Sequence, residues 1–170
     1  MQIVNGLGAT NGYPDDPVTN DPLLTTTNGV GNLIVGYNEL RMLPFFPLSN
    51  DRTGSHGVVV GTRNDYTSYG GLVAGDFNAS SGPYSSVAGG NDNQALGLYA
   101  SISGGFGGRA IGPWSAIGGG HAGKATGEYS SVSGGRLNVA AGNYATVGGG
   151  GFRNAPGYDD WVAGGLFEDF

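Results

Sequence analysis

The chain has 170 residues, of which 36 are glycine and 8 are proline; only 12% are charged, and the formal net charge is −6. It has no cysteine, which excludes disulfides, thiolate metal sites and a thiol nucleophile. An acidic chain offers no basic patch to neutralise phosphates, so nucleic acid is not an expected partner. No stretch approaches the roughly 18 apolar residues of a membrane span, so no membrane insertion by this chain is expected.

The first segments of the chain lie outside the regular repeat described below. Residues 1–30 are rich in proline and threonine, and we expect them to form an extended segment that caps one end of the fold. Residues 33–36 form a short β-favouring stretch that ends in glycine. Residues 37–53 then insert the most apolar short stretch of the chain, residues 42–48.

The insertion at 37–53 carries Phe45 and Phe46 side by side. A solvated loop does not ordinarily hold two adjacent phenylalanines, so two interpretations stay open. The apolar stretch packs over the body of the fold, or it contacts another subunit or a target. Phe45 and Phe46 are therefore candidate partner-binding residues.

A repeat of fifteen residues dominates the rest of the chain. Glycine opens each unit, a β-branched residue follows five positions later, and a second glycine follows after three more. The opening glycines are Gly82, Gly97, Gly112, Gly127, Gly142 and Gly157. Units of fourteen residues precede them, so that about nine coils are expected. Their β-branched anchors are Ile34, Val59, Val73, Val87, Ile102, Ile117, Val132, Val147 and Val162.

This repeat predicts an all-β parallel β-roll, or β-solenoid, over residues 31–165. Each unit has a β-favouring stretch such as Tyr84-Ser85-Ser86-Val87-Ala88, a glycine pair, and a second short stretch ending near Ala95. Each coil should therefore contain two short strands, with turns made by glycines at positive φ. Asparagines such as Asn78 and Asn93, three residues after a turn glycine, are expected to adopt left-handed geometry. Residues 166–170 are expected to cap the C-terminal end.

The residues beside each anchor predict association between chains. They are apolar in the early coils, as at Val58 and Val60, and small in later ones, as at Ser101 and Ser131. A face of small residues lets another backbone come close, either the opposite wall of a thin coil or a neighbouring subunit. Because each coil buries little apolar surface, we expect a homo-oligomer, either a trimer or a filament.

The units Tyr84-Ser85-Ser86-Val87-Ala88-Gly89 and Tyr129-Ser130-Ser131-Val132-Ser133-Gly134 resemble a known pattern. They are similar to the S-V-A-I-G head repeats of YadA-like trimeric autotransporter adhesins, over about residues 54–165. The coil is fifteen residues here rather than the usual fourteen, and the second apolar residue of the motif is mostly Ser, Ala or Gly. The resemblance implies a left-handed parallel β-roll, a trimeric head and an extracellular or cell-surface location.

One aromatic residue occupies the same position in five successive coils. These candidate partner-binding residues are Tyr84, Tyr99, Trp114, Tyr129 and Tyr144. Stacked strands would place them about 4.8 Å apart in one row. Two interpretations are open: a packing ladder that fixes the register, or a flat stripe that binds a glycan or a partner surface.

The sequence predicts a non-enzymatic module with no cofactor and no metal site. The only histidines, His56 and His121, fall at different places in their coils, and the carboxylate pair Asp159 and Asp160 is expected to be solvated. Nothing assembles a nucleophile, a base and an oxyanion donor. The expected function is an adhesin-like head or receptor-binding module of an extracellular surface protein or fibre, with a host or cell-surface protein or glycan as partner. The alternative is a subunit of a self-assembling filament.

Overall fold

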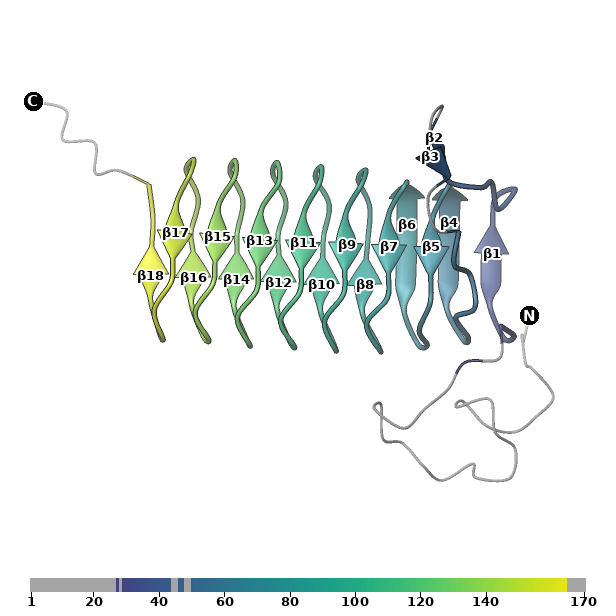
Figure 1. The fold of residues 1–170 in the computed structure, drawn as a ribbon, viewed down its shortest axis with the longest axis horizontal. Helices are drawn as coiled ribbons and strands as arrows, with labels where there is room; N and C mark the ends of the chain where they lie inside the picture. The colour runs from purple at the N-terminus through teal and green to yellow at the C-terminus, as the bar shows by residue number, and fades with distance from the viewer. Residues whose placement is uncertain (1–26, 28, 44–45, 48–49, 165–170) are drawn as a thin grey trace, which may run out of the picture.

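The computed structural model describes residues 27, 29–43, 46–47 and 50–164, and within them the chain forms a parallel β-solenoid without helices (Figure 1). Two parallel sheets run along the rod. The nine-stranded sheet consists of β1 (Leu33–Val35), β4 (Val58–Thr62), β6 (Leu72–Asp76), β8 (Ser86–Val87), β10 (Ser101–Ile102), β12 (Ala116–Ile117), β14 (Ser131–Val132), β16 (Thr146–Val147) and β18 (Trp161–Val162). The seven-stranded sheet consists of β5 (Asp65–Tyr66), β7 (Ala79–Ser80), β9 (Gln94–Ala95), β11 (Arg109–Ala110), β13 (Lys124–Ala125), β15 (Val139–Ala140) and β17 (Asn154–Ala155).

The predicted fold class and the two short strands per coil are confirmed. All nine predicted anchors lie in the nine-stranded sheet, where consecutive anchors pair directly, as Ile102 does with Val87 and Ile117. Seven of these strands are followed by a strand of the second sheet. The described chain therefore makes about seven complete turns, with β1 and β18 as single strands at the two ends (Figure 1). Of the predicted caps, at 1–30 and 166–170, residues 1–26, 28 and 166–170 lie outside the described residues.

The core is a thin layer between the two sheets. The anchors from Val59 to Val147 face inward and are at most 3% exposed, opposite a column of alanines from Ala95 to Ala155 that is fully buried. Because strand residues alternate between faces, the residues beside each anchor point outward. Of the two explanations left open for the small-residue face, the opposite wall of the same coil is therefore wrong.

Two columns of glycine serve different purposes. Gly90 and its equivalents turn the chain at positive φ, with φ of +86° at Gly90, as predicted. Gly97 belongs to the column that opens each unit, where the need is close approach: a Cβ there would lie 2.2 Å from the carbonyl oxygen of Gly112 in the next coil. From Gly82 to Gly142, a side chain in that column would push two coils apart.

The buried asparagines do not adopt the predicted left-handed geometry. Positive φ falls on the residue before each one, such as Phe77 (60°) and Asp92 (56°). Asn93 is fully buried, and its Oδ1 accepts the backbone N–H of Gly108 at 2.9 Å while its Nδ2 donates to the carbonyl of Gly105 at 3.0 Å. The side-chain amide of asparagine at this position therefore links the turn to the backbone of the next coil.

Glycine replaces this asparagine in two coils, at Gly108 and Gly123, and in both coils the anchor is isoleucine instead of valine. A Cβ at Gly108 would already lie 3.6 Å from Cδ1 of Ile117. The larger anchors thus occupy part of the volume that the asparagine side chain fills elsewhere.

Candidate functional site

The predicted aromatic column is a continuous stack of rings along one edge of the rod. Neighbouring centroids from Tyr84 to Tyr144 lie 4.9–5.8 Å apart, and their planes differ by 7–19°. Tyr69 contacts the first ring edge-on, and Tyr158 is tilted against the last. The structure thus brings all five predicted column residues together in one row.

These aromatic residues lie at the corners of the coils, and not in strands as the sequence suggested for Tyr84. Each has a positive φ, from 54° at Trp114 to 61° at Tyr144. This conformation is uncommon for a bulky residue. It holds here because the backbone N–H is bonded to the previous coil, as from Tyr99 to the carbonyl of Pro83 at 2.9 Å. Burial, followed by the neighbouring Tyr69 and Tyr99, raises the pKa of Tyr84 above its ordinary value.

The stacking decides what this column presents to solvent. Ring faces cover one another, while the rings from Tyr99 to Tyr144 remain 42–46% exposed at their edges. A glycan that stacks on a ring needs an open face, and inside the column no face is open. The column therefore presents ring edges and hydroxyl groups, and partner binding through it stays a prediction.

The insertion at 37–53 is anchored to the rod by two arginines. The Arg41 side chain is buried, and its guanidinium donates to Asp65 Oδ2 at 2.9 Å and to the carbonyl of Phe77 at 2.8 Å. Burial nevertheless raises the pKa of Asp65 above its ordinary value. Arg52 bonds to the carbonyl of Asn64 at 3.3 Å. These bonds hold the two flanks of the insertion on the rod. The packing of its apolar stretch, residues 42–48, over the body of the fold stays a prediction.

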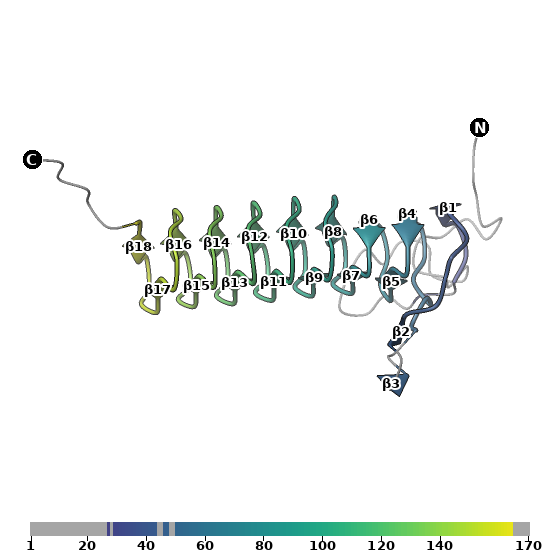
Figure 2. The same cartoon turned by 90° about the horizontal axis from the view of Figure 1, so that it is seen from above.

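The outer part of the insertion projects from the rod (Figure 2). Strands β2 (Met42–Leu43) and β3 (Phe46–Pro47) pair antiparallel, with Leu43 opposite Phe46. Phe45 lies outside the described residues, and for Phe46 only the backbone is described. Contact between this hairpin and a partner stays a prediction.

A second column on the opposite edge of the coil escaped the sequence analysis. Bridges join Asp76, Asn91, Phe106, His121 and Arg136 in successive coils. Phe106 stacks on His121 with centroids 5.3 Å apart and planes 4° from parallel. A hydrogen bond from Arg63 holds the pKa of Asp76 below its ordinary value. In the sequence, each member of this column directly follows a turn glycine. These residues differ so much in type that the column does not stand out as a repeat.

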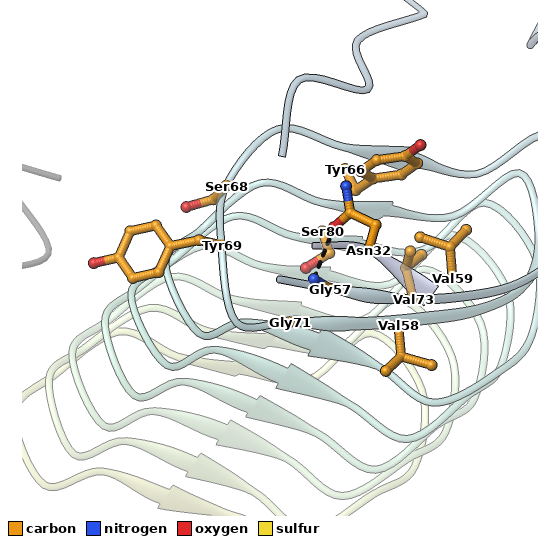
Figure 3. Close-up of a pocket in the computed structure, with 10 residues that line it drawn as sticks. All are labelled: Asn32, Gly57, Val58, Val59, Tyr66, Ser68, Tyr69, Gly71, Val73 and Ser80. Carbon is orange, nitrogen blue, oxygen red and sulfur yellow. Dashed lines mark hydrogen bonds between the residues drawn. The ribbon is translucent and has the colours of Figure 1, made fainter. Parts of the chain in front are cut away.

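A small cavity lies inside the first turns of the rod (Figure 3). Its volume is about 10 Å³, and its lining includes Val59, Tyr66 and Val73. The ladder pairs Tyr66 with Ser80, and Ser80 with Ala95. Tyr66 therefore stands in the column of residues that alanine fills in later coils. The space is about that of one water molecule and too small for a ligand.

The described residues contain no group of three or more His, Cys, Asp or Glu side chains that could hold a metal ion. Nor does any helix in the described part have the length and apolar character to cross a membrane. Asp160 was predicted to be solvated, but its Oδ2 accepts a hydrogen bond from the N–H of Gly157 at 2.6 Å.

Comparison with known protein families found no model that matches this chain, and comparison with curated proteins found no matching sequence.

Proposed function

We propose that this chain is a non-enzymatic binding module, the adhesin-like head or receptor-binding part of an extracellular surface protein or fibre. It acts through the sides of a rod of fixed length and binds a cell-surface protein or glycan. The observation that carries the proposal concerns the two edges of the seven-stranded sheet: backbone groups at its N-terminal edge are bonded within the chain, and its C-terminal edge lacks two ladder donors. Edges of this kind disfavour end-to-end stacking, so the rod is suited to display surfaces along its sides.

At the N-terminal end, the returning part of the insertion closes the edge of β5. The backbone N–H of Tyr66 donates to the carbonyl of Asp51 at 3.1 Å, and the carbonyl of Tyr66 accepts the N–H of Gly54 at 3.0 Å. Both edge-facing groups of Tyr66 are thus bonded within the chain. No further coil can pair with them.

At the C-terminal end, two departures from the repeat close the edge of β17. In earlier coils the residue after the column alanine donates its N–H to the next coil, as Ala141 does to Ala155 at 2.9 Å. Its equivalent in the last turn is Pro156, which has no N–H. The following glycine, Gly157, donates to Asp160 instead of to a next coil. Proline and a local carboxylate thus remove two donors that a further coil would use.

The alternative of a stacked filament is tested by restoring the repeat at this end. We expect the wild-type chain to form discrete particles in electron micrographs. The double variant Pro156→Ala with Asp160→Ser regains the residue types of earlier coils. We expect it to associate through its C-terminal end into paired particles of about twice the wild-type length, because the N-terminal edge stays closed. Asp159→Ser, which removes the same charge nearby, is the control and should keep the wild-type length. Long fibres of the wild-type chain would refute the head and support the filament.

A homo-oligomer, and specifically a trimer, is part of the proposal. The outer face of the nine-stranded sheet is apolar at one end, where Val35 is 53% exposed and Val58 and Val60 are more than a third exposed. It then continues as small residues such as Ser101 and Ser131. Such a face allows the close approach of a second sheet. The left-handed winding implied by the adhesin repeats stays a prediction with it.

We expect light scattering to give a mass about three times 17.1 kDa for the purified chain. Leucine at both Ser101 and Ser131 should lower this mass, because the larger side chains hold a neighbouring backbone away. Leucine at Gln94 and Asn154, on the outer face of the other sheet, is the matched control and should leave the mass unchanged. A stable wild-type monomer would contradict the oligomer.

An extracellular or cell-surface location is part of the proposal, because the repeats resemble those of surface adhesins. The net charge of −6 disfavours nucleic acid and anionic lipid as partners.

A further inference from the structure

A shallow groove of about 300 Å³ lies on the edge opposite the aromatic column. It is lined by Arg63, Phe77, Asn91, Asp92 and Phe106, which come from the turns of four successive coils. Two aromatic side chains therefore meet three polar side chains in one open depression. This combination of aromatic surface with a few hydrogen-bonding groups is typical of small-ligand sites.

The phenylalanines along this edge differ in what covers their rings. The guanidinium of Arg41 lies 4.0 Å from the centroid of Phe77, and that of Arg136 lies 5.2 Å from the centroid of Phe152. Phe106 is 48% exposed and stacks on His121 with one face only. Among the described residues, no ring or cation covers its other face.

That face is open because the equivalent residue in the preceding coil turns away from it. Asn91 Nδ2 donates to the carboxylate of Asp76 at 2.9 Å and to its backbone carbonyl at 3.2 Å. The side chain of Asn91 thus leans toward the earlier coil. It leaves a space beside Phe106 that an aromatic residue at position 91 would fill by stacking.

The polar side chains of the groove offer both donors and acceptors. In the described structure, Asn91 Oδ1 and Arg63 Nη1 make no hydrogen bond, while Nε and Nη2 of Arg63 bind Asp76. The Asp92 carboxylate is 3.9 Å from Arg41, too far for a hydrogen bond, and its side chain is 40% exposed. A ligand in the groove can therefore both donate and accept.

The charges around the groove exclude strongly charged ligands. An anion would meet the carboxylates of Asp76 and Asp92, and a cation would meet the guanidinium groups of Arg41 and Arg63. A neutral ligand avoids both. A pyranose ring has one apolar C–H face to stack on a phenylalanine and hydroxyl groups at its rim that donate and accept.

We propose that this groove binds one pyranose unit of a neutral glycan, with a C–H face of the sugar on the open face of Phe106. Asp92 and Asn91 accept from its hydroxyl groups, and Arg63 donates to them. This inference rests on the proposed binding function and names the ligand class. It assigns the glycan to this groove and not to the aromatic column, whose ring faces are already covered.

The test is saturation-transfer NMR of the full chain with the methyl pyranosides of glucose, galactose, mannose and N-acetylglucosamine. At least one should receive saturation, strongest on the protons of one ring face. Asn91→Phe fills the space beside Phe106, and Phe106→Ser removes the platform; each should weaken binding about tenfold or more. Phe152→Ser removes an exposed phenylalanine of the same edge outside the groove, and this control should bind as the wild type does.

The groove is refuted if none of the four glycosides receives saturation. It is equally refuted if a glycoside binds the Asn91→Phe and Phe106→Ser variants as well as it binds the wild type, because the sugar then sits elsewhere. Circular dichroism of each variant confirms that the fold is retained. The shape of the particles in electron micrographs separates this test from that of the proposed function. Discrete particles that bind no glycoside would refute only the glycan site in the groove. Fibres that bind the glycoside would refute only the proposal of an adhesin-like head.

Discussion

Asn93→Ala is expected to lower the free energy of unfolding by about 3–5 kcal/mol. The Asn93 side chain is fully buried and makes three hydrogen bonds to backbone groups, to Gly89, Gly105 and Gly108. Alanine leaves the N–H of Gly108 buried without a partner and opens a small cavity. Both effects act between neighbouring coils, so the loss should also reduce the cooperativity of unfolding.

Asn143→Ala is the matched control for this prediction. Asn143 is exposed and accepts one hydrogen bond, from the N–H of Glu128 at 3.0 Å. Its replacement should cost less than about 1 kcal/mol. Urea unfolding followed by circular dichroism, at one fixed protein concentration, measures both variants. Equal small losses would show that the buried asparagine does not link the coils.

Deletion of one whole coil, residues 112–126, is expected to leave a folded and shorter rod. Ser101 and Ile102 now pair with Ala116 and Ile117. After the deletion they would pair with Ser131 and Val132, which occupy the same register one coil later. Each coil contacts only its neighbours, so the remaining turns keep their packing. Circular dichroism and hydrodynamic size check the outcome.

Deletion of residues 112–118 alone should abolish folding of the following coils. It would move Lys124 into the buried anchor position of Ile117 and displace the glycines that allow close approach between coils. A register shift of this kind exchanges inner and outer side chains. The coil assignment would be wrong if both deletions caused equal damage.

The repeat was sufficient to predict the coil, because its demands recur every fifteen residues. The anchors, the buried alanines and the glycine columns each satisfy one local requirement of a parallel stack, and the sequence displays them in every unit. The aromatic column was predictable for the same reason. Its ring orientation was not, because stacking depends on the positive φ of residues such as Trp114, and that conformation follows from bonds to the previous coil.

What the sequence analysis missed occurs once or depends on hydrogen bonds between coils. Arg41 finds Asp65 across an insertion, and no spacing rule connects them. Pro156 and Asp160 close an edge only because they stand in the last described turn. The role of Asn93 was misassigned because asparagine suits both left-handed turns and amide bridges, and only the backbone groups beside it decide between the two.

The direction of the ladder hydrogen bonds determines how the rod responds to mechanical load. Strands β1 and β18 lie at opposite ends, and the bonds between coils run along the long axis (Figure 1). A pull along that axis loads one interface between coils at a time, rather than shearing many bonds together. Each released coil of fifteen residues would extend to about 50 Å, against the roughly 4.8 Å that it occupies when folded. Under flow, a rod of this construction lengthens in steps from one end, and the coils still wound keep their lateral surfaces intact.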